Sequence, residues 1–309
     1  MAQHPIKQSI FLAGPTAVGK SAVALALAEN IGGEIISVDS MQVYRGLDLG
    51  TAKPSAEERT RVPHHLIDVV ELSEPFDAAK FVALANQAVA AIHSCSRVPI
   101  FCGGTGLYFK AYLEGLGEAP PSDAHLRAEL EATPLAELLR ELEQRDAVTF
   151  ARIDRQNPRR LVRAVEVIRL TGKPFSEQRA EWKSKVQSSR KEVIFVLTRQ
   201  PVDLHARINL RVDEMFARGL IVETRRCLDH GLAQNKTAMQ AIGYRQVVEH
   251  LRGERSLSET IELVKSKTRQ FAKRQMTWFR KQANAQWVEL KPGDSLIEVR
   301  QHLSELGSG

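Results

Sequence analysis

The chain has 309 residues, of which 43% are hydrophobic and 26% charged, an ordinary composition for a soluble globular protein. Its longest apolar run, 22–28, is too short to span a bilayer, and no N-terminal stretch looks like a signal peptide. Three scattered cysteines exclude a disulfide framework or a zinc knuckle, so we expect a cytoplasmic protein without a membrane partner, and the net charge of +6 favours a polyanionic one.

The first predicted elements enclose a phosphate loop. Residues 9–13 (SIFLA) predict a buried strand, and 22–28 predict a helix. Between them, GPTAVGKS matches the pattern G-x-x-x-x-G-K-[ST], and the strand–loop–helix context argues against a chance glycine loop. Lys20 would reach the outer phosphate and Ser21 would ligate Mg²⁺, but the pattern does not separate a diphosphate from a triphosphate. The candidate phosphate-binding residues are Gly14, Pro15, Thr16, Ala17, Val18, Gly19, Lys20 and Ser21.

A carboxylate follows the second predicted strand, 34–38 (EIISV). The carboxyl ends of parallel strands face the ligand crevice of an open α/β sheet, so Asp39 is expected beside the phosphate loop. There it would ligate Mg²⁺ or accept a proton from a nucleophile. The alternative is a cap residue of the next helix, which a dense polar stretch over 42–53 makes less favourable.

Two further motifs are ambiguous. Residues 98–102 (VPIFC) predict a third strand, and the glycines of 103–106 (GGTG) would allow either close approach to a ligand or a tight turn. His64 and His65 are adjacent, a spacing that favours a structural or substrate-edge role over a metal pair.

The remaining pattern predicts an inserted helical region. Apolar residues recur at helical spacing over 118–192, residues 193–197 (VIFVL) predict a fourth strand, and the chain after Pro201 is mostly helical. We therefore predict an α/β fold, a P-loop parallel sheet core over 1–117 and 193–309, with an α-helical insertion domain over 118–192.

Two segments are strongly basic. One lies in the insertion around 152–179, and the other, 265–281, interleaves Lys and Arg with Phe271, Trp278 and Phe279. Arginine and lysine bind phosphates and aromatic rings stack unpaired bases, so the two segments beside a phosphate loop favour RNA over a merely solvated face.

Together these motifs resemble the bacterial tRNA dimethylallyltransferase family, also called tRNA isopentenyltransferases. The matching stretches occur in family order over nearly the whole chain: GPTAVGKS at 14–21, DSMQVYRGLDLGTAKP at 39–54, HHLIDV at 64–69, GGTGLYFKA at 103–111, RRLVRAVEV at 159–167, AIGYRQ at 241–246 and TRQFAKRQMTWFR at 268–280.

The resemblance implies transfer of a dimethylallyl group from dimethylallyl diphosphate to the N6 amine of the adenosine 3′ of the anticodon. The acceptors are tRNAs that read codons starting with U, the insertion grips the anticodon stem-loop, the cofactor is Mg²⁺, and we expect a monomer. The implied catalytic residues are Asp39 as the base, Lys20 and Arg211 at the diphosphate, and Thr105. The implied tRNA contacts are Asp39, Ser40, Met41, Gln42, Thr105, Arg127, Arg159, Arg160, Leu161, Val162, Arg163, Gly243, Tyr244, Arg245, Lys273, Arg274 and Arg280.

The chain departs from the family pattern at two positions. Val18 stands where serine is common, which should not disturb the loop, and Arg159 stands where glutamine is common, so it would contact a phosphate or a base edge. Three other functions remain open: a small-molecule P-loop kinase, an isopentenyltransferase of free adenine nucleotides, and a non-catalytic RNA-binding protein.

Overall fold

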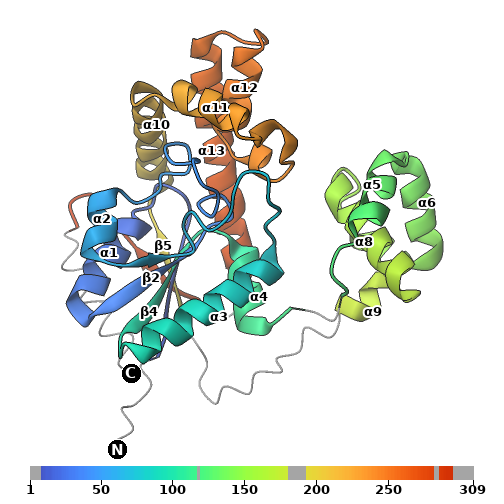
Figure 1. Cartoon of the computed structure of the whole chain (residues 1–309), viewed down its shortest axis with the longest axis horizontal. Coiled ribbons are helices and arrows are strands. Elements are labelled where there is room, and N and C mark those ends of the chain that lie inside the picture. The colour runs from blue at the N-terminus through green and yellow to red at the C-terminus, as the bar shows by residue number, and fades with distance from the viewer. Residues whose placement is uncertain (1–7, 117–118, 180–192, 282–284, 295–309) are drawn as a thin grey trace, which may run out of the picture. The chain divides into compact units, whose positions relative to one another are not determined.

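The computed structural model describes residues 8–116, 119–179, 193–281 and 285–294. The chain divides into two compact units, one formed by Met1–Lys110 with Arg190–Gly309 and the other by Ala111–Ser189 (Figure 1). The helical unit, expected over 118–192, thus corresponds to Ala111–Ser189, and residues 180–192 lie outside the described ranges.

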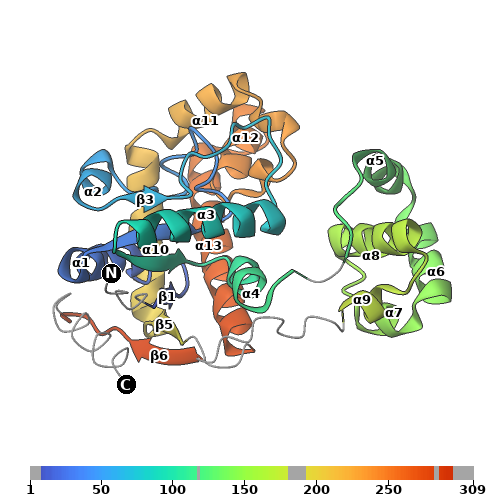
Figure 2. The same ribbon diagram turned by 60° about the horizontal axis from the view of Figure 1, so that its bottom comes forward.

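The first unit is built on one parallel sheet of six strands in the order β3-β2-β4-β1-β5-β6. This confirms the predicted α/β class. Figure 2 shows β5 and β6 side by side at one edge. Every residue of β2 and β4 is buried, because helices cover a parallel sheet. The strands are β1 (Ile10–Ala13), β2 (Gly33–Val38), β3 (His64–His65), β4 (Val98–Gly103), β5 (Ile194–Thr198) and β6 (Ala285–Glu289).

The strand order brings three loops together. β4 lies between β1 and β2, and both Ala13 and Val38 are paired with Gly103. The segments that follow these strands therefore start at the same level of the sheet, on the same edge. Asp39 is confirmed to lie on the same edge as Gly14, as the carboxyl-end argument requires.

The helices of this unit cover the sheet and extend beyond it. α1 buries Val23, Ala24 and Leu27 in the core and contacts β2 and β4, and α13 contacts α10 and α12. The helices are α1 (Lys20–Ile31), α2 (Ala56–Arg61), α3 (Ala78–Ser94), α4 (Gly106–Glu114), α10 (Pro201–Ala217), α11 (Leu220–Asp229), α12 (Tyr244–Leu251) and α13 (Leu257–Arg280), with 3-10 turns η1 (Leu232–Gln234) and η2 (Ala238–Gln240).

Two strands were not predicted from the sequence, the two-residue β3 and β6. β6 has a single buried residue, Val288, while Trp287 is 42% exposed, so it lacks the continuous apolar run of the inner strands. The strand forms because its backbone pairs with β5, and its own sequence has no apolar pattern that would predict it.

The second unit is a helical cluster around α8 (Pro158–Thr171). Asn157 caps α8, Pro158 occupies its first turn, and Gly172 ends it in a left-handed conformation. Its apolar face packs against α5 and α6 through Leu130, Leu138 and Leu142. The other helices are α5 (Ala124–Ala132), α6 (Leu135–Arg145), α7 (Ala147–Arg152) and α9 (Phe175–Arg179).

Leu161 tests this core. It is fully buried, so Leu161→Ala should lower the free energy of opening of α8 by about 2–5 kcal/mol, through lost burial and the cavity left behind. Hydrogen exchange of the slowest α8 amides measures this. Arg160→Ala, at the exposed neighbour, is the control and should change opening by less than about 0.5 kcal/mol. Equal effects at both positions would contradict the packing.

Candidate functional site

The loop over 14–21 has the backbone of a phosphate cradle. Gly14, Ala17 and Gly19 all have positive φ, at 150°, 64° and 112°. A Cβ on Gly14 would lie 2.7 Å from the carbonyl oxygen of Leu197, so only glycine fits there. The loop leads directly into the N-terminus of α1, where free N–H groups and the helix dipole favour an anion.

Lys20 is poised at this cradle. Its Nζ donates to the carbonyl oxygen of Pro15 at 2.7 Å, a contact within the loop. Burial, together with the nearby charge of Arg211, lowers the pKa of Lys20 to about 8. The ammonium is therefore short of negative partners, and an anion in the loop would supply one.

Three arginines near the loop have different roles. Arg199 donates from Nε to Val18 O at 2.8 Å, and Arg207 donates from Nε to Ala17 O at 3.0 Å, so both hold loop carbonyls. Arg211, one turn after Arg207 on α10, instead lines the cavity described below. Within the described ranges Arg211 has no hydrogen-bond or ion-pair partner, and its pKa is lowered by burial and by Arg207.

Asp39 does not cap a helix, because the next helix, α2, begins only at Ala56. Its Oδ1 accepts from the backbone N–H groups of Met41 at 2.8 Å and Gln42 at 3.3 Å. Its Oδ2 accepts no hydrogen bond from the residues that the structure describes. One oxygen of Asp39 thus fixes the turn, and the other is available to a ligand.

The turn after β4 joins the phosphate loop and the Asp39 turn. Thr105 Oγ1 accepts from the N–H of Ser40 at 3.2 Å, and Gly104 N donates to Val38 O at 3.2 Å. A Cβ on Gly103 would lie 2.1 Å from Val38 O. Gly103 is therefore required by close packing against the backbone of Val38, a reason that neither interpretation of the glycines at 103–106 gave.

Gln275 of α13 is a site residue that the sequence did not reveal. Its Oε1 accepts from Thr16 N at 2.9 Å, and its Nε2 donates to Gly104 O at 3.0 Å. The side chain therefore ties the phosphate loop to the turn after β4. Sequence reasoning considered only the basic and aromatic residues of this segment, and a single glutamine 259 residues away from Thr16 gives no local signal.

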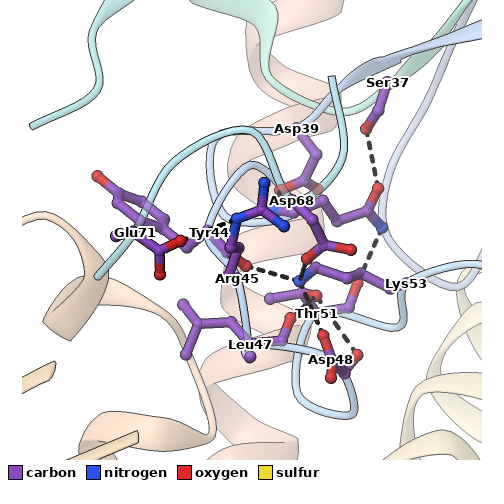
Figure 3. Close-up of polar contacts among 12 residues, drawn as sticks. Ser37, Asp39, Tyr44, Arg45, Leu47, Asp48, Thr51, Lys53, Asp68 and Glu71 are labelled. Atoms are coloured by element: carbon purple, nitrogen blue, oxygen red, sulfur yellow. Dashed lines mark hydrogen bonds and ion pairs between the residues drawn. The ribbon is translucent and has the colours of Figure 1, made fainter. Parts of the chain in front are cut away.

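The polar segment after Asp39 is internally braced (Figure 3). Gln42 Oε1 accepts from Ser37 Oγ at 2.8 Å, and Gln42 Nε2 donates to the carbonyls of Thr51 and Ala52 at 3.1 and 3.3 Å. Lys53 follows directly, and its ammonium donates to Tyr44 O at 2.6 Å and to two carboxylates.

These segments enclose a cavity of about 400 Å³. Its polar lining comes from the phosphate loop, Asp39 and Arg211. Its apolar lining includes Val212 and Met215. The lining residues include Thr16, Lys20, Ser21, Asp39, Ser40, Met41, Gln42, Thr51, Cys102, Thr105, Arg211, Val212, Met215, Ile242, Val264, Phe271, Arg274 and Gln275. A second cavity of about 570 Å³ shares Ala52, Arg211 and Met215 with the first.

Several residues expected to contact tRNA are buried instead. Leu161, Val162 and Tyr244 are 0%, 6% and 0% exposed, so the expectation of side-chain contacts to tRNA is wrong for these three. They satisfy the helical periodicity of a core face. The Tyr244 hydroxyl donates to Glu223 at 2.6 Å and accepts from Gly50 N at 3.1 Å, and Gly243 is buried next to it.

The arginines of the second unit fall into two groups. Arg127 Nη2 and Arg163 Nη1 both donate to the Glu166 carboxylate, which is fully buried, so these arginines stabilise the unit. Arg159 and Arg160 are exposed at the start of α8. In the first unit, Arg245, Lys273, Arg274 and Arg280 are exposed as well.

The two histidines have protein partners. His65 Nε2 lies 2.6 Å from Glu34 Oε2, and His64 Nδ1 lies 2.7 Å from Val62 O. Across the described ranges, no group of three or more His, Cys, Asp or Glu residues could hold a metal ion. The structural interpretation of the pair is therefore the better one.

Fold and site together define a P-loop α/β protein with a cavity beside its glycine-containing loop. The family model of IPP transferase matches residues 42–282. The chain is 46% identical over 292 residues to tRNA dimethylallyltransferase 1 of Trichlorobacter lovleyi, covering 93% of this chain and 95% of that protein. It is 43% identical over 306 residues to the tRNA dimethylallyltransferase of Geobacillus kaustophilus, covering 96% and 95%.

Solved structures agree with these matches. The tRNA isopentenylpyrophosphate transferase of Bacillus halodurans is 38% identical with a TM-score of 0.69, covering 98% of this chain and 100% of that one. A eukaryotic dimethylallyltransferase studied acting on tRNA is 29% identical with a TM-score of 0.79, covering 92% and 74%. The chain belongs to the IPP transferase family, which confirms the resemblance seen in the sequence. No helix in the described ranges has the length and apolar character needed to cross a membrane.

The lowered pKa of Lys20 predicts a pH dependence. Only the ammonium form attracts a phosphate, and this form is lost in the free protein as the pH rises through about 8. Affinity for inorganic diphosphate should therefore fall above pH 8, and binding near pH 9 should take up a proton. Calorimetry in buffers of different ionisation enthalpy measures both effects. Lys20→Met should abolish the proton uptake near pH 9, and unchanged uptake in that variant would assign it to another group.

Proposed function

We propose that this chain transfers the dimethylallyl group of dimethylallyl diphosphate to the N6 amine of an adenosine in tRNA. The acceptor is the adenosine 3′ of the anticodon in tRNAs reading codons that start with U, and the product is N6-isopentenyladenosine. The observation that carries the proposal is the cavity, which holds a phosphate loop, a carboxylate with one free oxygen, and apolar walls. Family membership supports the same chemistry.

At the donor end, the leaving group is a diphosphate. As the C–O bond to the allylic carbon breaks, negative charge accumulates on the diphosphate, and fixed cations in a partly dry cavity stabilise that charge most. Lys20 and Arg211 line the cavity and lack strong anionic partners, which suits them to this role.

The donor end also suits Mg²⁺. Ser21 lies at the loop with its hydroxyl free of hydrogen bonds to described residues, and hydroxyl and phosphate oxygens are the ligands that Mg²⁺ prefers. Bound there, Mg²⁺ would neutralise part of the diphosphate charge. Asp39 is too engaged by its turn to serve as more than one further oxygen ligand.

At the acceptor end, Asp39 is placed to act as the base. The adenine amine is a weak nucleophile, and a carboxylate that takes its proton as the N–C bond forms is worth about 10²–10⁴ in rate. The adenine must first leave its stack, at a cost of a few kcal/mol. Met41, Ile242 and Phe271 offer the cavity apolar surface for a base or a prenyl chain.

The exposed basic residues are the proposed tRNA contacts. Arg159 and Arg160 of the helical unit, with Arg245, Lys273, Arg274 and Arg280 of the first unit, expose positive charge that would attract phosphates. The helical unit would thereby hold the anticodon stem-loop. Arg127 and Arg163 have fewer donors left for tRNA, because each donates to Glu166 and Arg163 Nη2 also donates to Pro120 O at 2.6 Å.

One assay separates the alternatives. The protein is incubated with labelled dimethylallyl diphosphate, Mg²⁺ and either tRNA, adenine nucleotides or no acceptor. Label in tRNA alone supports the proposal. Label in free nucleotide supports the small-molecule prenyltransferase, and phosphate transfer from ATP without prenylation supports the kinase. No transfer of any kind would leave an RNA-binding protein.

Asp39 can be tested without breaking its turn. Asp39→Asn retains an oxygen that accepts from Met41 and Gln42 but removes the base, so turnover should fall by a factor on the order of 10² or more. Affinity for tRNA should change little. Single-turnover kinetics and filter binding measure the two effects. Asp39→Ala should lose more because the turn also loosens. Wild-type turnover with weakened tRNA binding would make Asp39 a binding residue.

Arg211 and Arg207 form a matched pair on α10. Arg211→Ala should lower kcat more than Arg207→Ala, because diphosphate charge appears only as the bond breaks, whereas Arg207 acts on the Ala17 carbonyl. Steady-state kinetics with varied donor compare kcat and KM for both variants. The reverse ranking would assign the leaving-group contact to Arg207.

A further inference from the structure

The ammonium of Lys53 is buried in the segment that follows Asp39. Its side chain is 3% exposed, and its three N–H bonds have three acceptors (Figure 3). These acceptors are the carbonyl oxygen of Tyr44 at 2.6 Å, Asp48 Oδ1 at 2.8 Å, and Asp68 Oδ1. A buried lysine with no free donor is not placed to bind a ligand, so its effect must pass through the residues that it holds.

The contacts of Lys53 join two segments that come from different strands. Tyr44 and Asp48 belong to the segment after β2, and Asp68 belongs to the segment after β3. Asp68 has a positive φ of 56°, as Leu66 has at 62°, and such conformations need support from their surroundings. Asp68 receives that support from Lys53 on one oxygen and from Arg59 on the other, at 2.8 Å.

The same ammonium fixes the wall of the cavity. Ala52 precedes Lys53 directly and has a positive φ of 50°. The carbonyls of Thr51 and Ala52 accept from Gln42 Nε2, and Gln42 in turn accepts from Ser37 at the end of β2. Thr51, Ala52 and Gln42 all line the cavity. Displacing Lys53 would therefore release the hydrogen bonds that hold Gln42.

The phosphate loop does not depend on this network. It is held by Arg199, which directly follows β5, by Arg207 of α10 and by Gln275 of α13. The Oδ1 of Asp39 is held by its own turn, and Ser40 is held by Thr105. A loss of Lys53 should therefore affect the wall formed by 42–52 and spare the donor end.

We propose that Lys53 is a positioning residue that holds the acceptor wall of the cavity, from Gln42 to Ala52, in register with Asp39. This rests on the proposed function for its kinetic readout. The structural readout is independent of it, because the order of residues 42–53 can be measured without any substrate.

Lys53→Met is the informative variant, since methionine keeps most of the chain length and removes the ammonium. The kcat/KM for tRNA should fall by a factor on the order of 10 to 10², as expected when a reacting group is misplaced. Affinity for inorganic diphosphate, measured by calorimetry, should stay within about twofold. Hydrogen exchange should accelerate at the amides of Arg45, Ala52 and Lys53, which are bonded to Val70, Leu49 and Asp48.

Two further variants separate positioning from folding. Lys80→Met is the control for loss of a paired ammonium: Lys80 donates to Glu74 at 3.1 Å, and neither residue lines the cavity. It should keep wild-type kinetics. In the double variant Lys53→Met with Asp68→Asn, the carboxylate whose Oδ1 has lost its partner becomes a neutral amide, so the variant should regain thermal stability without regaining kcat/KM.

Each outcome decides the question. Exchange at 42–53 and tRNA kinetics equal to those of Lys80→Met would overturn the proposal, and so would a parallel loss of diphosphate affinity. Recovery of kcat/KM in the double variant would also overturn it, since stability alone would then explain the defect. Wild-type protein that fails to prenylate tRNA would refute the proposed function, while accelerated exchange at 42–53 in Lys53→Met would still support the bracing role.

Discussion

Two parallel strands, β1 and β2, end opposite the same residue of β4, Gly103, and the site depends on this register. Gly103 lets the backbone of Val38 approach where a Cβ would lie 2.1 Å from its carbonyl oxygen. The phosphate loop, the Asp39 turn and the Gly104–Thr105 turn consequently start together. Gln275 then links the phosphate loop to Gly104, and Thr105 links the same turn to Ser40. A larger residue at 103 would separate a cation from a carboxylate that must face one cavity.

The cations around the phosphate loop are of two kinds, those that hold backbone carbonyls and those that line the cavity. Arg199 and Arg207 satisfy the outward carbonyls of the phosphate loop, whereas Lys20 and Arg211 point into the cavity with lowered pKa values. Burying two cations without anions costs stability in the free protein, and a bound polyanion relieves that cost. The same arrangement suits the cavity to the diphosphate of the proposed donor.

Basic residues that look alike in sequence have different roles. Arg159 and Arg163 are both in α8, but the first is exposed and the second pairs with the buried Glu166. The periodicity of α8 predicts its buried face, yet Arg163 borders that face, and Arg127 reaches the same carboxylate from α5. Which arginine pairs with a buried carboxylate and which lies at the surface is decided by contacts from another turn or helix, which no spacing rule reveals.

Local patterns in the sequence determined the α/β class, the phosphate loop, the strand that ends at Asp39 and the separate helical region, because each depends on neighbours within a few residues. Gln275, the brace formed by Lys53 and Asp68, and the edge strand β6 could not be found in this way. The partners of these side chains lie elsewhere along the chain, and β6 is a strand only because it pairs with β5. The division of Arg207 and Arg211, one holding a carbonyl and the other lining the cavity, was likewise decided only when α10 packed beside the loop. Contacts between distant segments carry no periodic signature, so only the folded chain determines which polar groups meet.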